Sequence, residues 1–111
     1  MKIMLVEDEK ITRKTLTDIL KKENYDINSF SDGTEALNSL KQDCYDVVVT
    51  DLRLPGTNGL DILRSAKEIN ARTIVIIITA YATVETAIES LKLGAYDYLL
   101  KPFSPEQLLS I

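Results

Sequence analysis

Apolar residues along the chain alternate between short continuous runs and stretches in which they recur every three or four positions. Continuous runs are typical of strands buried on both faces of a parallel sheet, and the spaced stretches are typical of amphipathic helices. The segments with strand character are Ile3–Val6, Tyr25–Phe30, Val47–Val49, Thr73–Thr79 and Tyr96–Leu100. The alternation therefore predicts five strands, each followed by a helix.

The stretches between the strands carry apolar stripes at helical spacing. The stripes consist of Ile11, Thr15, Leu16, Ile19 and Leu20, then Ala36, Leu37 and Leu40, then Leu60, Leu63, Ala66 and Ile69, then Val84, Ala87, Ile88 and Leu91. Such stripes are expected to face the sheet. We predict a doubly wound α/β fold with helices on both faces of a five-stranded parallel sheet, in the strand order 2-1-3-4-5.

Capping residues mark several helix ends. Asp32 is a good N-cap for the second helix, and Gly94 is suited to end the fourth. The stretch Ser104–Gln107 is a strong start signal for a fifth helix, but the sequence stops soon afterwards at Ile111. We expect residues 1–111 to form a single domain whose fifth helix is cut short.

The composition excludes several classes of function. The 111 residues include 17 acidic and 13 basic side chains, and the resulting net charge of -4 disfavours direct nucleic-acid binding by this segment. Histidine is absent, so histidine bases, Ser-His-Asp triads and histidine metal ligands are excluded. No apolar run has the length of a membrane span or of the core of a signal peptide. A cytoplasmic location is the default expectation.

Polar residues with reactive side chains stand where the predicted strands end. Glu7 and Asp8 follow the first strand, Asp51 follows the third, Thr79 ends the fourth, and Lys101 follows the fifth. The carboxyl ends of parallel strands meet at one edge of a sheet, and ligands bind there. We expect these five side chains to share one pocket.

Three carboxylates in one pocket repel one another unless a cation joins them, and Mg²⁺ (or Mn²⁺) prefers such oxygen ligands. With the cation bound, Asp51 can act as a nucleophile toward phosphorus. Lys101 and Thr79 can then stabilise the oxygens of the phosphoryl group. Taken singly, these residues are explained as caps, turn, strand or surface residues. Their joint occurrence at the strand ends favours the reactive site.

These residues and their neighbours also carry a resemblance to a known family. The pattern consists of Glu7-Asp8, Asp51-Leu-Arg-Leu-Pro-Gly, Thr79-Ala and Lys101-Pro-Phe. It resembles the receiver domain of bacterial two-component response regulators, from Met1 to about Gln107. The resemblance implies a flavodoxin-like fold and a signalling switch that accepts a phosphoryl group on Asp51 from a sensor histidine kinase. The resemblance also implies that the chain is not a conventional enzyme, because such a domain catalyses only its own phosphorylation and dephosphorylation.

The resemblance implies a role for each site residue. Asp8 and Asp51 would hold Mg²⁺ directly, and Glu7 would act largely through bound water. The backbone carbonyl of Arg53 would complete the protein ligands. Lys101 would pair with Asp51 before transfer and with the phosphoryl group afterwards, and its bond to the following proline would be cis.

The same resemblance implies how the switch would work. Thr79 would move toward the phosphate and Tyr98 would turn inward behind it, which would reshape the face made by the fourth helix, fifth strand and fifth helix. Similar domains use this face to form a homodimer or to bind an output domain or effector protein. Arg53 and Tyr81, two residues past the acceptor and the threonine, would influence how fast the phosphate is lost.

A narrower resemblance concerns the stretch from Thr79 to Lys101. It is similar to the receivers of sigma-54-dependent (NtrC-like) activators, which also carry an ATPase module and a DNA-binding module. This resemblance implies a role in transcription regulation, with the chain as the N-terminal receiver of a longer protein.

Three alternative functions would each require different residues at these positions. A flavin-binding module needs a phosphate-binding loop after the first strand, where Glu7-Asp8-Glu9 would repel a phosphate. A phosphatase with an aspartyl nucleophile commonly has a second acidic residue two positions further on, where this chain has Arg53. An unphosphorylated pseudo-receiver that acts only through protein contacts usually lacks the acceptor, the lysine or part of the acidic cluster.

Overall fold

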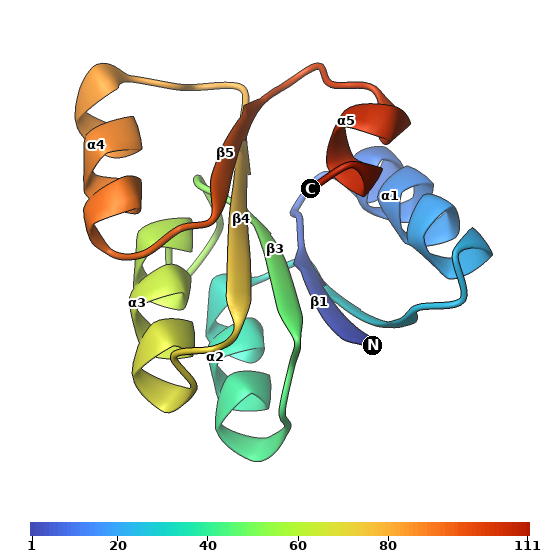
Figure 1. The fold of residues 1–111 in the computed structure, drawn as a ribbon, viewed down its shortest axis with the longest axis horizontal. Coiled ribbons are helices and arrows are strands. Elements are labelled where there is room, and N and C mark those ends of the chain that lie inside the picture. Colours follow the sequence, from blue (N-terminus) through green and yellow to red (C-terminus); the bar gives the residue numbers. More distant parts are fainter.

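The computed structural model describes all residues from 1 to 111 as an alternation of strands and helices (Figure 1). The strands are β1 (Lys2–Val6), β2 (Asp26–Phe30), β3 (Val47–Asp51), β4 (Ile74–Thr79) and β5 (Asp97–Leu100). The helices are α1 (Lys10–Lys22), α2 (Gly33–Gln42), α3 (Gly59–Ile69), α4 (Val84–Lys92) and α5 (Pro105–Leu109). Every predicted strand and helix is therefore present.

The strands form one parallel sheet in the order β2-β1-β3-β4-β5, so the predicted doubly wound fold is confirmed. The register places Val6 beside Thr50, Asp51 beside Ile78, and Thr79 beside Leu100. The residues that follow β1, β3, β4 and β5 consequently leave the sheet at the same edge.

Helices cover both faces of the sheet. In Figure 1, α2, α3 and α4 lie on one side, and α1 and α5 lie on the other. Alternate strand residues point to opposite faces, so the strands supply two separate cores. The core under α2 and α3 contains Met4, Val6, Val48, Val75 and Ile77, and the core under α1 and α5 contains Ile3, Leu5, Val49, Ile76 and Ile78.

The predicted capping residues stand at the helix ends. The Asp32 side chain accepts a hydrogen bond from the amide of Thr34, at 2.6 Å, and caps α2. Ser104 and Gln107 form a reciprocal capping box at the start of α5. Gly94 follows α4 with φ +97°, a backbone conformation that favours glycine. The longest helix, α1, has 13 residues, and none of the helices has both the length and the hydrophobicity to cross a membrane.

The predicted stripe of α1 is only partly correct. Leu16 and Leu20 are buried in the core, but Ile11 is 77% exposed and Thr15 is also exposed. The helix therefore contributes only its middle and last turns to the core. Ile69, in the last turn of α3, is also exposed.

The prediction for α4 was wrong about which side faces the protein. Val84, Ile88 and Leu91 are exposed, whereas Ser90 is completely buried. Of the predicted stripe only Ala87 is half-buried, and beside it the buried hydroxyl is satisfied locally: Ser90 Oγ donates to the carbonyl of Thr86 at 2.8 Å. An amphipathic pattern shows that one side of a helix is apolar. That side faces the interior only where it can pack against a hydrophobic core.

The exposure of these apolar side chains leads to a test of stability. Leu63→Ala in α3 should lower the free energy of unfolding by about 2–5 kcal/mol, because Leu63 is fully buried and the substitution leaves a cavity. Leu91→Ala in α4 should change it by about 0.5 kcal/mol or less, because Leu91 is 62% exposed. Urea unfolding followed by circular dichroism measures both changes. A comparable loss in the two variants would show that the apolar side of α4 is buried.

Candidate functional site

The acidic side chains of the site are positioned by the ends of β1 and β3. Glu7 directly follows β1, and its amide donates to the carbonyl of Phe30 at 3.0 Å, which continues the strand pairing by one residue. Asp51 is the last residue of β3. The start of α3 packs closely against it: a Cβ on Gly59 would lie 2.2 Å from the carbonyl oxygen of Asp51. Only glycine permits this approach.

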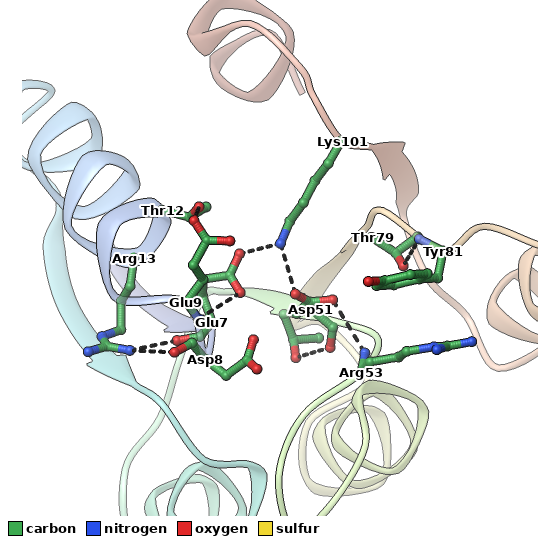
Figure 2. A network of polar contacts seen from close by, with 11 residues as sticks. Glu7, Asp8, Glu9, Thr12, Arg13, Asp51, Arg53, Thr79, Tyr81 and Lys101 are labelled. Atoms are coloured by element: carbon green, nitrogen blue, oxygen red, sulfur yellow. Dashed lines mark hydrogen bonds and ion pairs between the residues drawn. The ribbon is translucent and has the colours of Figure 1, made fainter.

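The predicted carboxylates meet at this edge of the sheet. Glu7, Asp8 and Asp51 each offer an oxygen atom, and these atoms lie within 4.8 Å of one another. Glu7 is fully buried and Asp51 nearly so, while Asp8 is exposed. Lys101 reaches in from the loop after β5 and forms ion pairs with Asp51, at 2.8 Å, and with Glu7 (Figure 2). The bond between Lys101 and Pro102 is cis, as predicted.

Burial and charge shift the proton affinities of this cluster. Burial raises the pKa of Glu7 from 4.5 to about 7; the bond from Lys101 opposes that shift, and the neighbouring Asp51 adds to it. Burial lowers the pKa of Lys101, but its bonds to Asp51 and Glu7 outweigh this effect and raise the pKa above its usual value. The lysine is therefore charged at neutral pH, and one lysine serves two carboxylates.

The donor set matches the preference of a hard divalent cation. Three carboxylates converge on one small volume, and at least one of them, Asp8, is open to solvent, where a cation that keeps several waters can enter. The same set contains no thiolate or imidazole. The residues present fit Mg²⁺ better than a metal that prefers nitrogen or sulfur ligands.

The other predicted site residues lie around this cluster at different distances from it. Thr79 is fully buried at the end of β4, and its hydroxyl accepts a hydrogen bond from the amide of Tyr81 at 2.9 Å. The amide of Arg53 donates to Asp51 Oδ1 at 3.3 Å. Tyr98 is half-buried, and its hydroxyl lies 2.9 Å from that of Thr86 on α4. Tyr98 therefore contacts α4 and is not part of the acidic cluster.

A hollow of about 390 Å³ opens above the acidic cluster. Its lining consists of Glu7, Asp8, Glu9, Asp51, Arg53, Ala80, Tyr81 and Lys101. On one side, the Arg53 guanidinium is stacked on the Tyr81 ring, 4.4 Å from the ring centroid, as a cation–π pair. The hollow is large enough for a phosphoryl group and it is walled mainly by charged residues.

Sequence reasoning missed Arg13, which lies behind the turn formed by Glu7, Asp8 and Glu9 (the acidic turn). This side chain comes from α1 and donates to the backbone carbonyl of Glu7 at 2.9 Å (Figure 2). A bond to a backbone carbonyl places no demand on the identity of the partner residue. The only available signal was the position of Arg13 in the first turn of the helix that follows the acidic pair.

Comparison with known proteins identifies the relatives of this chain. A family model described as the response regulator receiver domain matches residues 3–111. Regulatory protein AtoC of Escherichia coli (strain K12) is 36% identical over 107 residues, which is 96% of this chain and 23% of AtoC. Transcriptional regulatory protein QseB of Escherichia coli O157:H7 is 39% identical over 104 residues, which is 94% of this chain and 48% of QseB. The chain thus spans about a quarter to a half of these curated relatives.

A solved structure agrees with this assignment. It is a response regulator protein from Burkholderia pseudomallei with a phosphorylated aspartic acid, calcium ion and citrate. The similarity has a TM-score of 0.91 and 25% sequence identity, and it covers 98% of this chain and 64% of the other. The backbone described above is therefore similar to that of a response regulator of known structure over almost its whole length.

The raised pKa of Glu7 leads to a prediction about pH. Because the folded state binds the Glu7 proton more tightly than the unfolded state, its contribution to stability is present below pH 4.5 and is lost as the pH rises through about 7. With divalent cations removed, we expect the free energy of unfolding to fall by about 1–3 kcal/mol over this range. Glu7→Gln should remove most of that fall, and Glu89→Gln, which changes an exposed carboxylate on α4, should not.

Urea unfolding at pH 5 and pH 8 in a chelating buffer measures this difference. A Glu7→Gln variant that retained the wild-type loss of stability would show that the loss originates elsewhere.

Proposed function

The chain belongs to the response regulator receiver domain family, and on that premise we propose that Asp51 is the residue through which phosphorylation switches it. Members of this family are signalling switches of two-component systems, and several of the relatives are transcriptional regulators. The proposal for Asp51 is supported by one observation above all. Its carboxylate stands at the end of β3, among two further carboxylates and beside a lysine.

The acidic cluster is proposed to bind Mg²⁺ or Mn²⁺. Asp8 and Asp51 would hold the cation directly, Glu7 would act through bound water, and the backbone carbonyl of Arg53 would complete the protein ligands. The phosphorylated Burkholderia pseudomallei relative is described with a calcium ion, which supports an oxygen-liganded cation in this family. A bound Mg²⁺ would neutralise negative charge on the transferring phosphoryl group.

The proposed phosphodonor is a sensor histidine kinase that carries a phosphohistidine. A carboxylate oxygen of Asp51 attacks phosphorus, a P–O bond forms and the P–N bond breaks. The electron pair of the broken bond stays on the imidazole nitrogen, which takes up a proton. Lys101, already 2.8 Å from Asp51 Oδ2, is placed to shift its bond to a phosphoryl oxygen. Water later cleaves the acyl phosphate, so the domain catalyses only its own phosphorylation and dephosphorylation.

A groove beside Lys101 is a suitable docking place for the kinase. It has a volume of about 290 Å³ and is lined by Ile11, Thr12, Thr15, Leu16, Ile19, Lys101, Pro102, Phe103 and Pro105. The exposed Ile11 and the first turns of α1 border it. A partner seated in this groove would be held next to the lysine that bonds the acceptor, which supports transfer to Asp51 from this side.

The output surface is proposed to be the face of α4, β5 and α5. Phosphorylation adds negative charge at Asp51, and Thr79 would move to donate its hydroxyl to the phosphoryl group. Tyr98 would then turn inward and give up its bond to Thr86 on α4. Exposed apolar side chains on this face, among them Leu91 and Leu100, support its use for a homodimer or for binding an output domain or effector protein.

The wider role is proposed from the relatives. Residues 1–111 would form the single receiver domain of a cytoplasmic transcription regulator, and another module would contact DNA, since this segment has a net charge of -4. The sequence from Thr79 to Lys101 supports a sigma-54-dependent (NtrC-like) regulator as the parent protein.

The phospho-acceptor can be tested by intact mass. Incubation with acetyl phosphate and Mg²⁺ should add one phosphoryl group to the wild type, and a chelator should prevent it. Asp51→Asn should abolish the gain, because an amide is not a nucleophile toward phosphorus. The matched variant Asp61→Asn, which changes a half-buried carboxylate in the first turn of α3, should gain the group as the wild type does. Equal labelling of Asp51→Asn and wild type would refute Asp51 as the acceptor.

The cation–π pair of Arg53 and Tyr81 should set the lifetime of the phosphate. The stacked pair forms part of the lining of the hollow above Asp51. It would limit the approach of water to a phosphoryl group there. Arg53→Ala and Tyr81→Ala should each speed phosphate loss roughly two- to tenfold, in line with the strength of such pairs. The double variant should lose phosphate little faster than either single variant.

A time course of intact mass after removal of acetyl phosphate measures these rates. Arg64→Ala, which removes an exposed arginine from α3, is the control and should retain the wild-type rate. If the three wall variants also retained it, shielding by the pair would be excluded.

A further inference from the structure

Arg13 contacts the acidic turn from the side opposite to the hollow. Its Nη1 atom donates to the backbone carbonyl of Glu7 at 2.9 Å and lies 3.4 Å from that of Asp8. Figure 2 shows the guanidinium reaching both carbonyls from α1, while the carboxylates of Glu7 and Asp8 extend toward the side of Lys101 and Asp51. One half-buried cation therefore ties together the backbone of both acidic residues.

The acidic turn has few other fixed points. The amide of Glu7 donates to the carbonyl of Phe30, and the amide of Glu9 donates to Glu7 Oε2 at 3.4 Å, but Glu9 provides no side-chain cap for the helix that follows. The Asp8 carboxylate is exposed and has no ion-pair or hydrogen-bond partner, because Lys101 is engaged by Glu7 and Asp51. Like charges favour opening of this turn. Arg13 supplies the positive charge and the bonds that oppose it.

We propose that Arg13 is a positioning residue that holds Glu7 and Asp8 in the arrangement required to bind the divalent cation. This inference rests on the proposed cation site. The direction in which cation affinity changes when Arg13 is replaced distinguishes a positioning role from a purely electrostatic effect of its charge. Loss of a positive charge near a cation site should by itself tighten cation binding. Loss of a positioning residue should weaken it, as the loss of outer-shell partners of metal ligands does.

The test compares Arg13→Gln with Lys14→Gln, which removes the same charge from the next position of α1. Lys14 pairs only with Asp18 on the surface and its side chain is 76% exposed. Calorimetric titration with Mg²⁺ should show affinity roughly tenfold weaker in Arg13→Gln. Lys14→Gln should bind Mg²⁺ as tightly as the wild type or slightly more tightly. Arg13→Lys, which keeps the charge and one donor group, should recover part of the affinity.

A second readout does not depend on the metal. In metal-free protein, hydrogen exchange at the amides of Glu7 and Glu9, which donate to the Phe30 carbonyl and to Glu7 Oε2, should be several-fold faster in Arg13→Gln than in Lys14→Gln. Urea unfolding confirms that both variants are folded. Wild-type affinity in Arg13→Gln, or affinity tighter than the wild type, would overturn the proposal, and so would unchanged exchange at these amides.

The outcomes also separate this inference from the proposed function. A wild type that binds Mg²⁺ but takes no phosphoryl group from acetyl phosphate would refute the proposed function and leave the comparison of Arg13 with Lys14 valid. A wild type that is phosphorylated, together with an Arg13→Gln variant of normal Mg²⁺ affinity, would refute the role of Arg13 alone.

Discussion

Three carboxylates share one small volume at the edge of the sheet, with a single lysine among them, and the surrounding structure depends on this imbalance of charge. Two of the three are buried, where an unpaired charge is costly. The protein offsets part of that cost with Lys101, and Glu7 offsets another part by holding its proton to about pH 7. The negative charge that remains uncompensated attracts a further positive charge. The fold therefore builds a site whose residues fit a divalent cation.

The order of the strands makes this concentration of charge possible. In the order β2-β1-β3-β4-β5, the ends of β1 and β3 are neighbours, and the loop after β5 returns over them with Lys101. Two apolar cores on opposite faces of the sheet hold the strands in register, so the charged edge does not have to contribute to stability. The repulsion between the carboxylates is therefore tolerated by a sheet that the two apolar cores stabilise.

The fold and the acidic cluster were predictable because both depend on rules of period and position. Strand runs, helix caps and the meeting of parallel strand ends predict from the sequence that Glu7, Asp51 and Lys101 lie together. The inward side of α4 was not predictable in this way, because Ser90 is buried through a bond to its own helix. Arg13 was also missed, since its partners are backbone carbonyls that every residue possesses.

The reversed polarity of α4 has a consequence for signalling. A helix that keeps its large apolar side chains in solvent gains little from packing against the sheet, so small changes in its polar contacts can alter its position. One of those contacts is the bond between the hydroxyls of Thr86 and Tyr98, and Thr86 is also part of the capping box that starts the helix. A rearrangement of Tyr98 on β5 would thus act directly on the first turn of α4. Under the proposed function, the polar attachment that made α4 difficult to predict would let a change at the acidic site reach the surface.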